Sequence, residues 1–221
     1  MKTYESQGDK TRFLWHFPDA EKHFIEMLEA NPEYQFKVKR MLNDFQDLIN
    51  FDHVLDIGAN VGLWTRWFSR WGAKTIDCFE PMSGNIECLV ENTRDLSGIN
   101  IHQCALSNEP GTLTLYNAEE QKNSGAATIN ADKYLSTATT LSSHTVECKT
   151  LDSFDLAPTF VKIDVQGAEL LVLQGSEQTL KKHKPGLVVE CDQDGEILEL
   201  LNSWGYKKIM ERGSDVLMVA A

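Results

Sequence analysis

The hydrophobic pattern of the chain alternates between short apolar runs and stretches with helical spacing. Apolar runs typical of strands buried on both faces occupy residues 54–57, 75–79, 99–105, 160–165 and 187–191. Between them, apolar residues three and four positions apart predict helices over 63–71, 86–90, 168–183 and 196–201. Because strands that alternate with helices usually pair in parallel, the pattern predicts an α/β fold with a doubly wound, mostly parallel, Rossmann-like sheet of seven strands.

The two ends of the chain carry different patterns. Residues 206–210 and 216–219 are short apolar runs separated by a polar turn, which predicts an antiparallel hairpin at one edge of the sheet. Residues 19–30 and 34–49 have helical spacing, and Asn31-Pro32 separates them. We therefore predict a helical N-terminal appendage over residues 1–50 and a main domain over residues 51–221.

One long stretch has few large apolar residues. Residues 112–116 and 146–149 resemble additional strands, and residues 117–145 are predicted to be a long loop. Loops of this length in a compact domain are either functional or disordered insertions, and we expect a lid that faces the substrate. His144 in this stretch is either an acid or base, or a solvated histidine.

The composition is that of an ordinary globular domain, with 42% hydrophobic and 24% charged residues. A net charge of −12 disfavours binding to the phosphate backbone of a nucleic acid. The five cysteines are an odd number without a C-x-x-C pair, which favours reduced thiols over disulfides or a cysteine zinc site. We find no signal-peptide pattern and no apolar run near the ~18 residues of a membrane span, so we expect a cytoplasmic protein.

The stretch V-L-D-I-G-A-N-V-G-L-W-T at 54–65 predicts a strand, a glycine-rich turn and the start of a helix. In a doubly wound sheet such a turn lies where ligands bind. An NAD site would need G-x-G-x-x-G, but Asn60 replaces the middle glycine and no third glycine follows Gly62. The carboxylate of Asp56 would also repel a diphosphate. A plain tight turn at Gly58 and Gly62 is the structural alternative.

S-adenosylmethionine suits these groups better, because it carries an ammonium and a sulfonium but no phosphate. Asp56 could attract the ammonium directly or through water, and backbone N–H groups near Asn60 could receive the carboxylate. Glu80, at the end of the next strand, could accept both ribose hydroxyls, and Cys104-Ala105-Leu106 should lie beside the adenine. An acid at Glu80 would serve NAD equally, so only Asp56 and Asn60 distinguish S-adenosylmethionine from NAD.

Together with this turn, further segments resemble the FkbM family of S-adenosylmethionine-dependent methyltransferases. They are C-F-E-P (78–81), A-L-S-N-E-P-G-T-L-T-L-Y (105–116), N-S-G (123–125), T-L-D-S-F (150–154), F-V-K-I-D-V-Q-G-A-E-L-L-V-L-Q-G-S (160–176) and K-P-G-L-V-V-E (184–190). The resemblance covers residues 51–192 and implies a methyltransferase sheet and activity. The cofactor site it implies consists of Asp56, Gly58, Ala59, Asn60, Gly62, Thr65, Glu80, Pro81, Ala105 and Asp164. The chain departs from the family at Gln166, where an acidic residue is usual.

Three acidic residues are the candidate catalytic residues. Asp164 and Glu190 end two strands that should be neighbours, and Glu169 begins the following helix. One interpretation makes Asp164 or Glu169 a base or a group that positions the acceptor. Another makes Asp164 and Glu190 ligands of a divalent metal such as Mg²⁺, similar to metal-dependent catechol-type O-methyltransferases. In a third, Glu190 is only paired with backbone N–H groups or with Lys162, which strand alternation places on the same face as Asp164.

The leading functional hypothesis is O-methylation of a small-molecule or saccharide-like hydroxyl acceptor, and the resemblance implies this acceptor class. The alternatives are an S-adenosylmethionine-binding module without turnover, a methyltransferase that acts on nucleic acid or protein, and an NAD-dependent oxidoreductase. The edge hairpin and the N-terminal helices could both serve a homodimer, and no sequence pattern decides between them.

Overall fold

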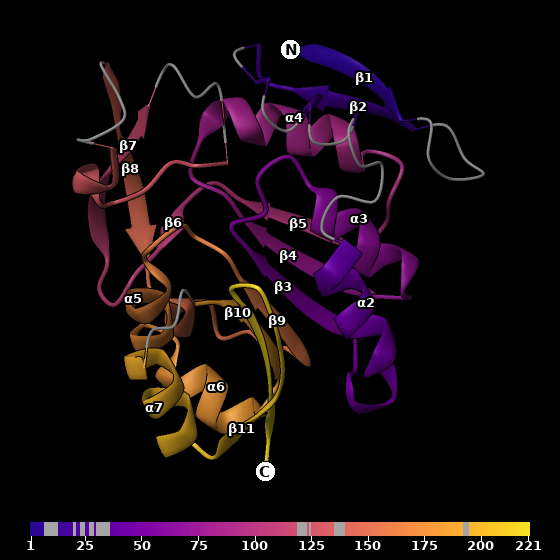
Figure 1. The fold of residues 1–221 in the computed structure, drawn as a ribbon, viewed down its shortest axis with the longest axis vertical. Helices are drawn as coiled ribbons and strands as arrows, with labels where there is room; N and C mark the ends of the chain where they lie inside the picture. The colour runs from indigo at the N-terminus through magenta and orange to yellow at the C-terminus, as the bar shows by residue number, and fades with distance from the viewer. Residues whose placement is uncertain are drawn as a thin grey trace.

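A seven-stranded sheet forms the centre of the molecule, with helices on both faces (Figure 1). The computed structural model describes residues 1–6, 13–19, 21–22, 25–26, 29, 36–118, 123, 125–134, 140–191 and 195–221. In spatial order the strands are β11 (Tyr206–Arg212), β12 (Asp215–Ala220), β10 (Gly186–Glu190), β9 (Phe160–Ile163), β3 (His53–Ile57), β4 (Thr75–Phe79) and β5 (Ile99–His102). The strands from β10 to β5 are parallel, whereas β12 is antiparallel to both of its neighbours. The predicted doubly wound sheet and its antiparallel edge hairpin are therefore confirmed.

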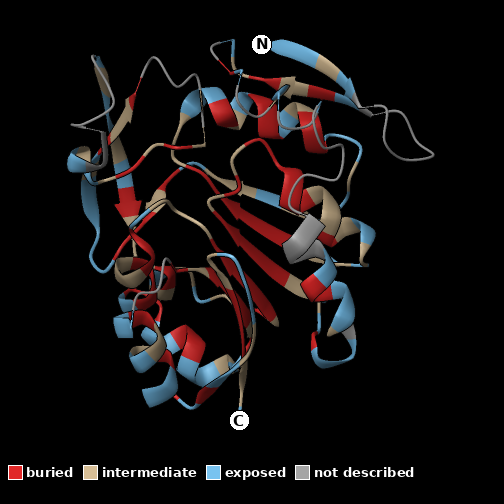
Figure 2. Cartoon of the chain, in the orientation of Figure 1, coloured by how far each residue is buried: buried red, intermediate tan, exposed pale blue. Residues whose placement is uncertain are grey.

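The central strands are buried on both faces, which explains their continuous apolar runs (Figure 2). Leu55 and Ile57 of β3 belong to the core layer that contains α5 (Glu169–Gln174), α6 (Glu177–His183) and α7 (Gly195–Ser203). Val54 belongs to the opposite layer, with α2 (Phe36–Asp44), α3 (Leu63–Arg70) and α4 (Ser83–Thr93). Each fully buried side chain of this size stabilises the fold by roughly 1.5–3 kcal/mol.

The helix predicted over 168–183 consists of two helices, α5 and α6, with Gly175 between them. A Cβ atom at Gly175 would lie 2.0 Å from the carbonyl oxygen of Ser107. This close approach of two backbones requires a glycine and ends α5 there. The strand predicted over 99–105 also divides, because β5 ends at His102 and Ala105 begins a strand of another sheet.

A small second sheet replaces both ends of the predicted long loop. Its order is β6 (Ala105–Leu106), β8 (Leu141–Lys149) and β7 (Gly111–Ala118), and β7 and β8 are antiparallel. Thr128 bridges back to Tyr116, and a 3-10 turn follows at Ala131–Tyr134. His144 is exposed on β8, opposite Leu115. Residues 119–122, 124 and 135–139 of the predicted loop lie outside the described residues.

The predicted helical N-terminal appendage is wrong at its start, because the chain begins with an antiparallel hairpin of β1 (Lys2–Ser6) and β2 (Phe13–Phe17) (Figure 1). Trp15 and Phe17, two positions apart, are buried in a cluster with residues of the glycine turn and of α4. Half of the residues of the helix predicted over 19–30 lie outside the described residues. The stretch predicted over 34–49 does contain α2 and a 3-10 turn at Gln46–Leu48.

Two further expectations from the sequence concern the thiols and membrane insertion. All five cysteines are free and buried, as the sequence predicted. The basic residues 181–183 lie in the last turn of α6, where they complement the helix dipole. Among the described residues, no helix is long and apolar enough to cross a bilayer. A further 3-10 turn, Leu151–Phe154, connects β8 to β9.

Candidate active site

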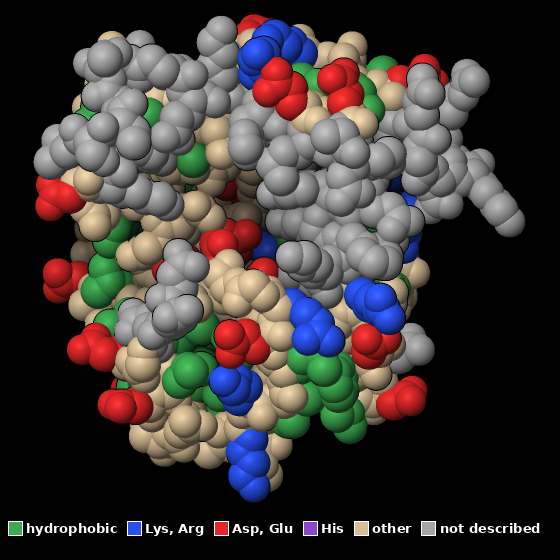
Figure 3. Space-filling view, viewed as in Figure 1, with side chains coloured by type: hydrophobic (Ala, Val, Ile, Leu, Met, Phe, Trp, Pro, Cys, Tyr) green, Lys and Arg blue, Asp and Glu red, His purple; other side chains and the backbone are tan. Residues whose placement is uncertain are grey.

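A cavity of about 330 Å³ lies beyond the carboxyl ends of the central strands. Ile57 of β3, Glu80 after β4, Asp164 after β9 and Glu190 of β10 all line it. The strand order reverses between β3 and β9, and ligands bind at such switch points. In Figure 3, acidic and basic side chains lie together in a hollow near the middle of the face shown.

Most of the predicted site residues converge on this cavity. Those that line it are Gly58, Ala59, Asn60, Glu80, Pro81, Ala105, Asp164 and Glu190. Cys104 and Leu106, expected beside an adenine, also line it, as does Trp64. Four predicted residues do not line it: Asp56, Gly62, Thr65 and Glu169.

The turn after β3 depends on left-handed backbone conformations, with φ of 79° at Gly58, 50° at Asn60 and 89° at Gly62. A Cβ atom at Gly58 would lie 1.8 Å from the carbonyl oxygen of Asp164. Only glycine therefore allows the β3 turn to approach the end of β9 this closely. Asn60 tolerates its conformation because asparagine is among the few residues that adopt it readily.

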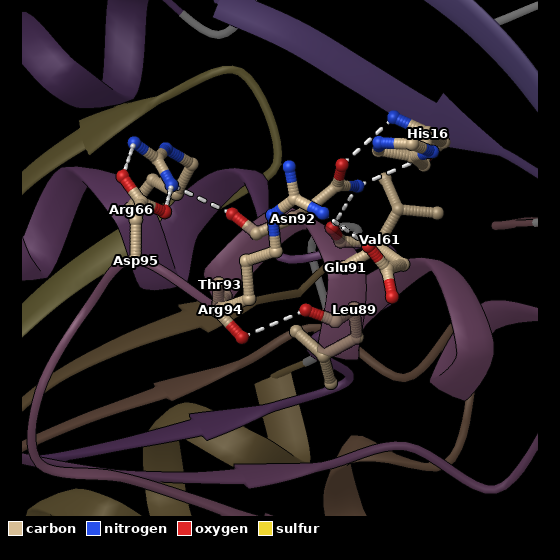
Figure 4. A network of polar contacts seen from close by, with 9 residues as sticks. All are labelled: His16, Val61, Arg66, Leu89, Glu91, Asn92, Thr93, Arg94 and Asp95. Carbon is tan, nitrogen blue, oxygen red and sulfur yellow. Dashed lines mark hydrogen bonds and ion pairs between the residues drawn. The ribbon is translucent and has the colours of Figure 1, made fainter.

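Asn92 of α4 binds the backbone of this turn and of the N-terminal hairpin (Figure 4). Its buried Nδ2 donates to the carbonyl oxygens of Val61 (2.8 Å) and His16 (2.9 Å), and the His16 N–H donates to its Oδ1 (2.7 Å). Arg66 donates to the Asn92 carbonyl oxygen and forms an ion pair with Asp95. The N-terminal hairpin, α4 and the glycine turn are thus joined at one side chain.

Glu80 is the acid at the end of β4, and it is only 5% exposed. Its Oε2 accepts from the Asn60 N–H (2.9 Å), and its Oε1 accepts from the Met82 N–H (2.9 Å) and from Asn85 Nδ2 (3.2 Å). Burial outweighs these donors and raises the pKa of Glu80 to about 7. This oriented carboxylate in the cavity wall can accept hydrogen bonds from a pair of hydroxyl groups.

Asp56 lies beneath the cavity floor and is fully buried. Its Oδ2 accepts from Thr65 Oγ1 at 2.7 Å, and Lys162 Nζ lies 3.8 Å from its Oδ1. The Lys162 ammonium also lies 3.2 Å from Oδ2 of Asp164, which confirms the shared face predicted from strand alternation. Burial lowers the pKa of Lys162, but Asp164 and Asp56 outweigh it and raise that pKa. The sequence predicted that Asp56 attracts a cofactor ammonium directly or through water; the structure places Asp56 and Thr65 beneath the floor, outside the lining of the cavity.

Gln166 bridges the two acids at the ends of β9 and β10. Its Nε2 donates to Asp164 Oδ1 at 2.9 Å and to Glu190 Oε2 at 2.8 Å. Ser214 Oγ donates to Glu190 Oε1 at 3.1 Å. Burial and the neighbouring Asp164 raise the pKa of Glu190 to about 8. Burial also acts to raise the pKa of Asp164, but Lys162 outweighs it and lowers that pKa. The two carboxyl groups titrate as a coupled pair, in which Lys162 favours the negative charge on Asp164 and burial favours the proton on Glu190.

Glu169 orders the loop after β9 and does not face the cavity. Its carboxylate accepts from the backbone N–H groups of Val165 (3.0 Å) and Gly167 (3.0 Å). These bonds lie on both sides of Gln166, whose φ is 58°. The geometry gives no support to the predicted catalytic role of Glu169, because this residue does not line the cavity.

The predicted Mg²⁺ site at Asp164 and Glu190 does not fit either. The oxygens that would face a shared ion already accept from Gln166, and a lysine ammonium lies beside Asp164. Across the described part of the chain, no cluster of three or more His, Cys, Asp or Glu side chains is arranged to hold a metal ion.

Several residues of the site were missed from the sequence. Asn85 lies five positions after Glu80 in the first turn of α4, and this spacing could have identified it. No sequence signal links Gly125 to Asn60, yet a Cβ atom at Gly125 would lie 2.7 Å from Asn60 Nδ2. Thr128 Oγ1 donates to the Gln166 carbonyl oxygen at 2.6 Å. The segment 125–129 therefore contacts both loops at the switch point.

Comparison with known proteins gives a consistent result. The family model described as the methyltransferase FkbM domain matches residues 56–208. The protein named Methyltransferase 1 from Beauveria bassiana (strain ARSEF 2860) is 29% identical over 184 residues, which cover 72% of this chain and 74% of that protein.

Three solved structures show the same fold. Methyltransferase FkbM from Methylobacillus flagellatus KT has a TM-score of 0.51 and 19% identity, over 76% of this chain and 43% of that chain, so this chain spans less than half of its length. The putative methyltransferase yhhF from Escherichia coli has a TM-score of 0.53 and 10% identity, over 100% and 99% of the two chains. The N-methyltransferase NodS from Bradyrhizobium japonicum WM9 has a TM-score of 0.51 and 12% identity, over 87% and 97%.

Proposed function

We propose that this chain, which belongs to the FkbM family of methyltransferases, methylates a hydroxyl oxygen of a small-molecule or saccharide-like acceptor, with S-adenosylmethionine as the methyl donor. One observation carries the proposal: Glu80 and the Asp164–Glu190 pair line the same cavity. In this proposal Glu80 would hold a diol, and the pair would hold a hydroxyl group and receive its proton.

The residues of the cavity fit S-adenosylmethionine, which supplies a methyl group on a positively charged sulfur when bound. Glu80 would accept from its ribose hydroxyls, because backbone and side-chain donors already hold this carboxylate in place. The turn from Gly58 to Gly62 would take the amino-acid end of the donor, and Cys104 to Leu106 would form apolar walls for its adenine.

The charge of the cavity favours a cationic ligand over a diphosphate. The two carboxylates of Asp56 and Asp164 flank a single ammonium, that of Lys162, so negative charge exceeds positive charge here. Glu80 adds further negative charge when it ionises. A sulfonium is attracted by this balance, whereas the diphosphate of NAD is repelled by it, which supports the methyltransferase over an oxidoreductase.

The Asp164–Glu190 pair can handle a proton during the reaction. Glu190 in its ionised form would accept the proton of the acceptor hydroxyl, while the oxygen gains its bond to the methyl carbon and the carbon–sulfur bond breaks. Asp164 stays ionised beside Lys162 and would orient the same hydroxyl. Because the pKa of Glu190 is about 8, the rate should rise with pH up to that value.

The test begins with calorimetric titrations of the purified protein with S-adenosylmethionine and with NAD. A panel of hydroxylated small molecules and saccharides then follows, with S-adenosylhomocysteine as the measured product. We expect binding of S-adenosylmethionine alone, and turnover that the Glu190→Gln variant reduces by about 100-fold or more. Binding without product from any hydroxyl acceptor would favour the cofactor-binding module. Product formed only with nucleic acid or protein would overturn the acceptor class.

A further inference from the structure

Two side chains occupy the space between the acids of the site. Lys162 is 3% exposed, and its ammonium lies between Asp56 and Asp164. Gln166 lies between Asp164 and Glu190 and donates to both. The five groups, three acids and two N–H donors, form one continuous alternating row at the carboxyl ends of β3, β9 and β10.

The carboxylate oxygens that a metal ion would require as ligands already interact with N–H and O–H donors. Asp164 uses Oδ2 toward Lys162 and Oδ1 toward Gln166. Glu190 uses Oε2 toward Gln166 and Oε1 toward Ser214. A divalent cation binds carboxylate oxygens at about 2.0–2.6 Å and would have to displace these donors. It would also lie within a few ångströms of a buried ammonium, where like charges repel strongly.

We propose that Lys162 and Gln166 act as positioning residues in place of a divalent cation, and that methyl transfer by this protein is independent of metal. Lys162 supplies the permanent positive charge that keeps Asp164 ionised. Gln166 sets the spacing of Asp164 and Glu190 without adding a charge. The positioning role rests on the proposed function, whereas the exclusion of a metal is tested without turnover.

The backbone around Gln166 is arranged to hold its amide in this position. Its left-handed conformation is unfavourable for a residue with a Cβ atom and requires support. Thr128 Oγ1 donates to its carbonyl oxygen at 2.6 Å, and Glu169 binds the N–H groups on either side of it. Both amide hydrogens of the side chain are therefore aimed at the two acids, which are acceptors.

The test measures Mn²⁺ binding by electron paramagnetic resonance, in wild type and in Gln166→Glu. The substitution keeps the shape but places a third carboxylate between the other two, which gives a set of oxygen ligands suited to Mn²⁺. We expect no binding by wild type up to about 1 mM Mn²⁺. The Gln166→Glu variant should bind Mn²⁺ at least about tenfold more tightly than this limit. Gln174→Glu is the matched control, because Gln174 is exposed on α5 and the change adds the same charge elsewhere.

The double variant Lys162→Met, Gln166→Glu should bind Mn²⁺ more tightly than Gln166→Glu, since the competing ammonium is gone. Affinity for S-adenosylmethionine and thermal unfolding report whether each variant is folded. Wild-type binding of Mn²⁺ below about 0.1 mM that Glu190→Gln abolishes would overturn the proposal. So would a Gln166→Glu variant that is folded but binds Mn²⁺ no better than Gln174→Glu. Failure to find an acceptor would count against the proposed function but would leave these measurements unaffected.

Discussion

Substitution of Glu80 by glutamine tests the assignment of the cofactor site most directly. The change preserves the size of the side chain and removes its charge. Oε1 accepts from two N–H donors and Oε2 from one, so an amide NH₂ group in either orientation faces at least one donor. The least unfavourable orientation places the NH₂ group opposite the Asn60 N–H, at the turn proposed to hold S-adenosylmethionine.

The expected loss of affinity follows from these contacts. A buried donor left without an acceptor costs about 1–3 kcal/mol, and a hydrogen bond from a ribose hydroxyl to a neutral amide is weaker than one to a carboxylate. We therefore expect the dissociation constant for S-adenosylmethionine to rise about 10–100-fold in Glu80→Gln. Isothermal titration calorimetry at a pH above 7 measures this constant while wild-type Glu80 is ionised.

The pH dependence gives a second, independent prediction. Burial raises the pKa of Glu80 to about 7, so the free protein holds this proton below that pH. Ribose hydroxyls favour the ionised form, so binding releases the proton, and affinity should rise with pH by up to about tenfold per unit below the pKa. Glu80→Gln should remove this dependence. Calorimetry in buffers with different ionisation enthalpies measures the number of protons released.

Glu87→Gln provides the matched control, because Glu87 is exposed on α4 and the change removes the same charge. It should leave affinity within about twofold of wild type. A folded Glu80→Gln variant that binds as tightly as this control, with the same pH dependence as wild type, would show that Glu80 does not hold the ribose.

Three further substitutions test the framework of the site. Gly58→Ala forces a Cβ atom to 1.8 Å from the Asp164 carbonyl oxygen at a φ of 79°, and it should reduce both thermal stability and S-adenosylmethionine affinity, by about tenfold or more for the latter. Asn92→Ala leaves buried partners unpaired and should lower the free energy of unfolding in urea by about 2–3 kcal/mol, whereas exposed Asn100→Ala should not. Equal effects of the two substitutions would contradict the role of Asn92 in joining the hairpin, α4 and the glycine turn. Asp77 accepts from His102 and His53, which outweigh its burial and lower its pKa below 3.8, so its contribution is present above that pH and is lost as pH falls below it. Acid unfolding followed by circular dichroism should therefore start from a lower stability and show a shallower loss in Asp77→Asn, and identical curves would refute this.

The local pattern of the chain was sufficient to predict the sheet and the strand ends that carry the site. Continuous apolar runs separated by helical spacing determine a parallel sheet, because only strands covered on both faces have that composition. Glu80, Asp164 and Glu190 each lie at or just after the carboxyl end of such a run, so their gathering at one edge was predictable. The glycine turn was predictable as well, because left-handed positions select glycine and asparagine.

Other features depended on partners far away in the sequence. Strands β1 and β2 form a hairpin because Trp15 and Phe17 are buried against the glycine turn and α4, which local propensity does not reveal. The expected loop over 117–145 begins and ends in strands because β7 and β8 pair with each other. In both cases, burial and strand pairing in the tertiary structure outweigh a weak local secondary-structure propensity.

The roles of the acids were likewise decided by the tertiary structure. Asp56 and Glu80 both follow apolar residues of neighbouring strands, yet one lies under the floor beside Lys162 and the other faces the cavity. Glu169 is engaged by backbone donors, whereas Glu190 is bridged to Asp164 by Gln166. The sequence determined which residues carry carboxyl groups and at which edge of the sheet they gather. Only the tertiary structure decided which carboxyl groups face the cavity, because that depends on how segments distant in the sequence pack around each of them.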